Sequence, residues 1–201
     1  MEVTFNMGAT FLWLAIFFRQ RYRPIFEKRC RVRVDAIPSE DSLIIRLWDR
    51  QKSISYSLKE FGGELFLFRN DALLAPRGRD AEGNPFPYAE GEVMYAFRAL
   101  ASVALDEAIC VSIRRAFARQ KISAVIYTLD IPPTVEVRPK GEEQRYLIVP
   151  RVRDDKLRCR VLQRDPQRYI FGDPVVLARF EIPLRDFRPD TIVKIFSLLR
   201  I

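Results

Sequence analysis

The 201-residue chain contains no histidine. Histidine is the side chain most often used for acid–base catalysis near neutral pH, and it is the commonest metal ligand. Its absence excludes Ser-His-Asp and Cys-His nucleophile systems and histidine-containing zinc sites. Glycine is also scarce, at eight residues, and it forms neither a phosphate-binding loop nor a GxSxG nucleophile elbow. The sequence therefore predicts a protein that is not an enzyme, with no cofactor and no metal site.

Cysteine is scarce too, with three residues that lie far apart and in no paired spacing: Cys30, Cys110 and Cys159. Each lies in an apolar or strand-like run, which predicts a buried, reduced thiol. Reduced thiols favour a reducing compartment such as the cytoplasm or a mitochondrial-type matrix.

Charge is absent from residues 3–18, and this run is strongly apolar. As a helix it would span about 24 Å, which is shorter than the ~30 Å hydrocarbon core of a bilayer. The side chains that we expect to contact a membrane or a partner are Phe11, Leu12, Trp13, Leu14, Ile16, Phe17 and Phe18.

Basic residues follow this run directly. Residues 19–33 carry seven positive charges and one negative charge, Glu27, so they hold +6 of the +8 net charge of the chain. We expect these side chains to contact anionic headgroups, an acidic partner or phosphate: Arg19, Arg21, Arg23, Lys28, Arg29, Arg31 and Arg33.

Three interpretations of residues 1–29 remain open. A cleaved signal peptide is disfavoured, because its positive charges would precede the apolar stretch. An uncleaved anchor, or a helix lying in the interface with its arginines on anionic lipid, fits better. The alternative is a helix buried in the core of the protein or against a partner subunit.

The remaining residues, 30–201, predict a single α+β domain. Residues 92–120 form the clearest helix, apolar around most of its circumference, with a narrow polar stripe of Arg98, Ser102, Asp106, Glu107 and Arg114. Alternating segments on both sides predict a mainly antiparallel sheet packed on this helix. A Pro- and Gly-rich loop at 75–91 interrupts the domain, and a short helix capped by Asp190 closes it. No internal sequence repeat is evident.

Basic side chains also alternate along a predicted strand at residues 157–163. Alternation places Arg158 and Arg160 on one face, where they form a candidate phosphate- or headgroup-binding surface. The alternative is a solvated face neutralised by Asp154, Asp155 and Asp165. Asp130 and Glu136, with Arg138 and Lys140, have the residue types of a metal-dependent nuclease, but not its spacing.

These features predict a non-catalytic, membrane-associated structural or assembly protein, such as an accessory subunit of a membrane complex or a matrix-like protein. Its partners would be membrane lipid, other protein subunits, or both, and its folded domain would lie on the reducing side. The alternative is a soluble, basic nucleic-acid-binding protein. A third hypothesis is an enzyme that uses only carboxylate, Lys, Tyr or Cys side chains.

Overall fold

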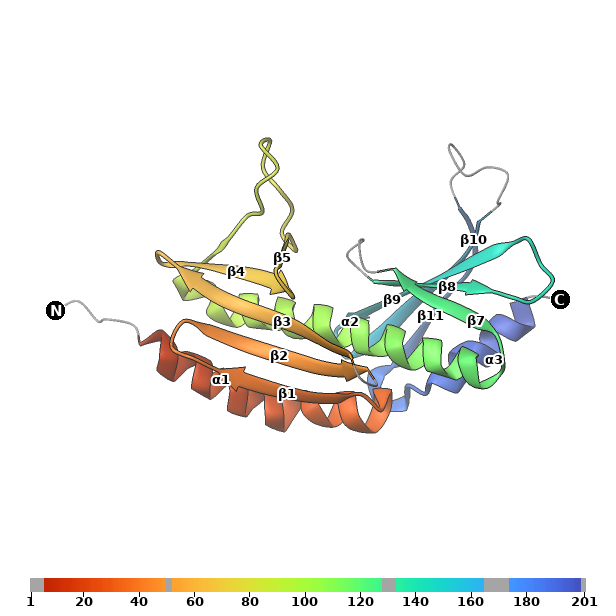
Figure 1. Ribbon diagram of the computed structural model, residues 1–201, viewed down its shortest axis with the longest axis horizontal. Helices are drawn as coiled ribbons and strands as arrows, with labels where there is room; N and C mark the ends of the chain where they lie inside the picture. Colours follow the sequence, from red (N-terminus) through yellow and green to blue (C-terminus); the bar gives the residue numbers. More distant parts are fainter. Residues whose placement is uncertain (1–5, 50–51, 128–132, 165–173, 200–201) are drawn as a thin grey trace. The chain divides into compact units, whose positions relative to one another are not determined.

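Two antiparallel meanders, each preceded by a helix, make up the architecture (Figure 1). The computed structural model describes residues 6–49, 52–127, 133–164 and 174–199. It confirms the α+β class, and it divides the expected antiparallel strands between two sheets. By its contacts the chain forms two compact units, residues up to 28 with 32–104, and residues 29–31 with 105–201. The same order of elements thus occurs in both units without a repeat in the sequence.

The first unit begins with helix α1 (Met7–Arg21), which the Asn6 side chain caps by accepting a hydrogen bond from the Ala9 amide at 3.0 Å. A π-helix at Ile25–Cys30 leads into the sheet. Its strands pair in sequence order, with the short β6 beside β4. They are β1 (Arg33–Pro38), β2 (Ser42–Asp49), β3 (Lys52–Phe61), β4 (Glu64–Arg69), β5 (Ala72–Leu74) and β6 (Tyr88–Ala89).

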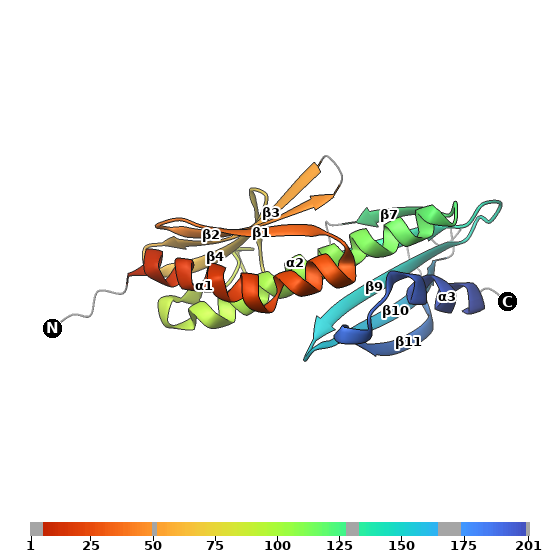
Figure 2. The ribbon, with the colours of Figure 1, turned by 90° about the horizontal axis from the view of Figure 1, so that it is seen from below.

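Helix α1 runs along one face of this sheet and packs on β1 and β2 (Figure 2). Phe11, Leu14, Ala15 and Phe18 are fully buried, at the i, i+3, i+4, i+7 spacing of one helix face. The interpretation of residues 3–18 as part of the protein's own core therefore holds for this face of α1.

The Pro- and Gly-rich loop at 75–91 is ordered by its own hydrogen bonds. The Asp80 carboxylate accepts from the amides of Glu82 and Asn84, at 3.0 and 2.8 Å, in a turn closed by Gly83, whose φ is +89°. Arg77 lies over the ring of Tyr88, which is buried. Tyr88 therefore packs on its own fold.

The second unit contains the C-terminal part of α2 (Val93–Arg119), five strands paired in sequence order, and α3 (Pro189–Leu199). One face of the sheet is apolar, and its Tyr146 ring packs edge-to-face on Phe196 of α3, which also meets Phe117 of α2. The strands are β7 (Ser123–Tyr127), β8 (Thr134–Arg138), β9 (Arg145–Arg153), β10 (Lys156–Arg164) and β11 (Val175–Pro183).

Two polar residues of this unit differ from their expected roles. Pro189 starts α3, a position that suits its fixed φ, so Asp190 lies in the first turn and is not the N-cap. Its carboxylate instead accepts from Arg119 at 2.8 Å. Asp106, from the polar stripe of α2, is buried, and its carboxylate accepts from the Val152 amide on β9 at 2.8 Å.

Candidate functional site

An exposed apolar ridge lies on α1, on the side away from its sheet contacts. Leu12, Trp13 and Ile16 are 52%, 52% and 45% exposed, and we call these three residues the α1 ridge. The Trp13 ring stacks on Phe17, with centroids 5.4 Å apart, which orients the indole along the helix. Adjacent exposed apolar residues of this kind are a candidate surface for contact with another molecule.

Not all of the predicted contact residues lie on this ridge. Phe11, Leu14 and Phe18 are buried against the first sheet, so they stabilise the fold and are not at the surface. Phe17 is half-buried, and its ring meets Phe97 at 5.9 Å. The seven predicted residues thus separate into a core face and an exposed face, and only the exposed face can contact a membrane or partner.

Among the residues that the structure describes, no helix combines the length and the apolar character that crossing a membrane requires.

The basic residues after α1 are partly engaged within the protein. The Arg19 guanidinium donates to the Ala36 carbonyl at 2.7 Å and lies 3.4 Å from the Asp35 carboxylate. Arg23 donates to Glu27 at 2.9 Å, one helical turn away. The contacts of Arg19 hold the end of α1 against β1, and both ion pairs reduce the net charge available to a partner.

The other cluster residues have mixed environments. The Arg31 backbone has a φ of +54°, and its carbonyl accepts from Arg115 at 2.8 Å, while Arg33 lies over the Trp48 ring. Arg21 and Lys28 are exposed, and Arg29 is half-buried. Some members of the predicted cluster are therefore engaged in contacts within the protein, and others are exposed.

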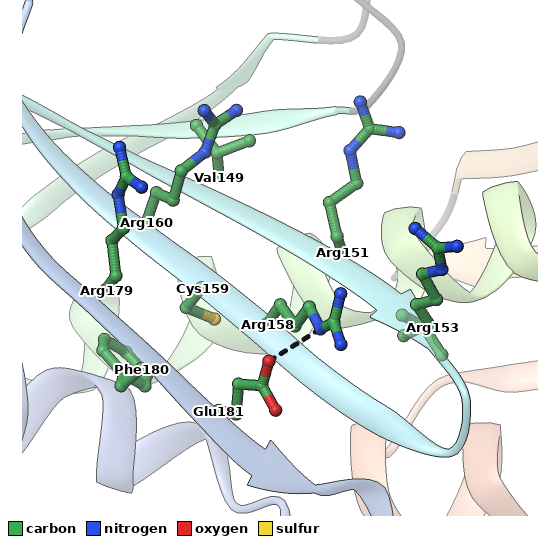
Figure 3. A pocket seen from close by; sticks show the side chains of 10 residues that line it. Val149, Arg151, Arg153, Arg158, Cys159, Arg160, Arg179, Phe180 and Glu181 are labelled. Atoms are coloured by element: carbon green, nitrogen blue, oxygen red, sulfur yellow. Dashed lines mark ion pairs between the residues drawn. The ribbon is translucent and has the colours of Figure 1, made fainter.

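A second basic surface lies on the sheet of the second unit, where Arg158 and Arg160 do share a face of β10 (Figure 3). An open groove of about 620 Å³ follows this face. We call its charged lining the arginine groove: Arg151, Arg153, Arg158, Arg160, Arg179 and Glu181.

Acidic residues neutralise the groove only in part. Glu181 lies 2.8 Å from Arg158, and Asp154 lies 3.5 Å from Arg153. Asp165, expected to contribute, lies outside the described residues. Sequence reasoning missed Arg179, which faces Arg160 across β10 and β11. The alternation of Arg179 and Glu181 was a visible signal, but their partners depend on strand register.

The three cysteine thiols have raised pKa values, which disfavour the thiolate form that nucleophilic catalysis requires. Burial raises the pKa of Cys30 and of Cys159 to about 12, and it raises the pKa of Cys110 as well. All three thiols are buried and free, which confirms that part of the sequence prediction. Burial also raises the pKa of Asp106 to about 7, against the opposing effects of the Val152 amide and Arg151.

Two of the residues with nuclease-like chemistry, Glu136 and Arg138, form an ion pair. Glu136 is buried and pairs with Arg138 and, at 3.7 Å, with Arg145. Asp130 lies outside the described residues. Within the described ranges, no group of three or more Cys, Asp and Glu side chains is arranged to hold a metal ion.

No family model, no curated protein and no solved structure matches this chain. Its function must therefore be argued from the α1 ridge and the arginine groove.

Proposed function

We propose that this protein is a non-catalytic structural or assembly protein that attaches reversibly to anionic membrane surfaces through the α1 ridge. The observation that carries the proposal is the exposure of Leu12, Trp13 and Ile16 on a helix whose opposite face is fixed to its own sheet. Helix α1 contains no acidic residue and ends with Arg19 and Arg21. An anionic lipid surface complements both properties, because it accepts apolar side chains beside cationic ones.

The expected affinity is modest. Burying a whole Leu or Ile side chain contributes about 1.5–3 kcal/mol, so the half-exposed ridge would contribute on the order of 3 kcal/mol. Each basic side chain near anionic lipid adds about 1 kcal/mol. Arg21 and Lys28 are the candidates for this contribution, because both side chains are exposed. The total is similar to that of a single acyl chain, about 10⁴ M⁻¹, which gives reversible attachment.

The three buried thiols favour a reducing environment for the folded part. We therefore propose a location on the cytoplasmic or matrix side of a membrane, where the protein would act as an accessory subunit or a matrix-like layer.

Vesicle flotation tests this proposal. The wild-type protein should float with phosphatidylserine-containing vesicles and less well with phosphatidylcholine alone. The double substitution Leu12→Ser and Ile16→Ser should weaken binding about 10-fold or more, because it removes about 1.4 kcal/mol or more of apolar transfer. High salt should also weaken the binding of the wild-type protein to anionic vesicles, because it screens the charges of the basic residues.

Leu198→Ser is the matched control, because Leu198 is 69% exposed on another helix, α3. This variant should float like the wild type. Absence of flotation for the wild type, or an equal loss of flotation in both variants, would refute the proposal.

A further inference from the structure

Like charges face each other across neighbouring strands in the second sheet. Arg153 of β9 is opposite Lys156 of β10, and in the next row on the same face Arg151 is opposite Arg158. In the third row Arg160 of β10 is opposite Arg179 of β11. Directly opposed residues of antiparallel strands have Cβ atoms about 4.5–5.5 Å apart, so like charges there destabilise the sheet.

From this arrangement we infer that the arginine groove is a binding site for a compact ligand carrying two or more phosphate groups. Its residues belong to the second unit and include none of the α1 ridge, so the inference goes beyond the proposed membrane attachment. A bound anion would convert each repulsive pair into two cations that share one counterion.

The charges in the groove are only partly compensated. Five arginines against one glutamate leave +4 in the lining, or +3 when Asp154, which lies 3.5 Å from Arg153, is included. Glu181 is already engaged with Arg158 at 2.8 Å and with Lys156 at 3.6 Å. Among the residues that the structure describes, no carboxylate lies within ion-pair distance of Arg160 or Arg179. A phosphate monoester carries about −1.5 to −2 at pH 7, so two are needed to balance the lining.

Arginine suits phosphate, because its planar guanidinium can donate two parallel hydrogen bonds to one phosphate group. The guanidinium groups of Arg151, Arg160 and Arg179 extend from the same side of the sheet (Figure 3). They lie on different strands, so they can reach different phosphate groups of one ligand.

The groove favours a compact ligand over a nucleic acid strand. Its volume, about 620 Å³, is that of a small-molecule site. Phe180 is the aromatic residue among those that line the groove, and its side chain points to the other side of β11 from Arg179, as the alternation of side chains along a strand requires (Figure 3). Base stacking, the usual means of holding single strands, therefore has no aromatic platform among the lining residues. The ligand would be recognised through its phosphates, either as a soluble molecule or as a phosphorylated lipid headgroup.

Titration with inorganic tripolyphosphate tests the site. We expect one ligand to bind per chain and to raise the melting temperature of the wild type, because a ligand that binds only the native state stabilises it. The substitutions Arg160→Gln and Arg179→Gln together should weaken binding at least about 10-fold, since hydrogen bonds to charged groups are strong. The variant should fold, because it removes a repulsive pair.

The control is Arg185→Gln with Arg188→Gln, which removes the same charge from exposed positions outside the groove. It should bind tripolyphosphate within about twofold of the wild type, as expected when no direct contact is lost. No binding to the wild type, or equal weakening in both variants, would overturn the inference. So would binding of single-stranded DNA that tripolyphosphate does not displace.

Vesicles containing a bisphosphorylated inositol lipid in neutral phosphatidylcholine distinguish the two ligand sources. Recruitment that depends on Arg160 and Arg179 and is displaced by tripolyphosphate would support the site with a lipid headgroup as its ligand. Tripolyphosphate binding without such recruitment would support the site with a soluble ligand. The Leu12→Ser and Ile16→Ser variant should retain tripolyphosphate binding, so failure of the membrane proposal would not affect this test.

Discussion

The Phe196→Ala variant should lose about 3–5 kcal/mol of its free energy of unfolding. Phe196 is fully buried on α3, and its ring contacts Phe117 at 5.2 Å and Tyr146 at 5.1 Å, both edge-to-face. Truncation leaves a cavity at the point where α2, α3 and the second sheet meet. Urea denaturation monitored by circular dichroism measures the change.

Leu198→Ala provides the comparison on the same helix. Leu198 is 69% exposed, so this variant should change the free energy of unfolding by less than about 0.5 kcal/mol. Similar losses at positions 196 and 198 would contradict the packing described for α3.

The Asp106→Asn variant should remove a pH dependence from the stability of the second unit. Burial raises the pKa of Asp106 from 3.8 to about 7 in the folded state. Between these values the native carboxyl holds a proton that the unfolded chain has lost, so stability falls as pH rises through this window. The maximum slope is about 1.4 kcal/mol per pH unit, and the loss is complete above the folded pKa.

The asparagine side chain cannot ionise, but its amide oxygen can still accept a hydrogen bond from the Val152 amide. The variant and the wild type should therefore have similar stability near pH 4, and the variant should be more stable at pH 8 by on the order of 2–4 kcal/mol. Urea denaturation at several pH values gives the comparison. A stability difference that stays constant from pH 4 to pH 8 would show that Asp106 does not titrate in this window.

Much of the fold could be predicted because its signals are local. The apolar run before Arg19, the long helix ending at Arg119 and the alternation along β10 each occur within one segment. The division of the strands between two sheets could not be predicted in this way. Strands pair in sequence order within each sheet, and alternation alone does not show whether the segments on the two sides of α2, which are far apart in the chain, join one sheet or form two. The buried position of Asp106 also depends on distant residues, since the Val152 amide that accommodates it lies on β9.

The candidate sites were predictable to different degrees for the same reason. Periodicity identified Arg158 and Arg160 on one face, but the pairing of Arg160 with Arg179 follows from the register of β10 with β11, which shifts between Val161 and Leu162. Apolar residues occupy every side of α1, so the sequence does not indicate which side of the helix the sheet covers. Only the packing on β1 and β2 distinguishes Leu12 and Trp13 from Phe11.

The central claim, contact between the α1 ridge and lipid, is tested most directly through Trp13. The chain has two tryptophans, so Trp48→Phe leaves Trp13 as the single indole fluorophore. On addition of anionic vesicles its emission should shift to shorter wavelength, and lipids brominated near the top of the acyl chain should quench it. Unchanged emission together with no quenching, while vesicles still bind the protein, would contradict the account and place the lipid contact elsewhere.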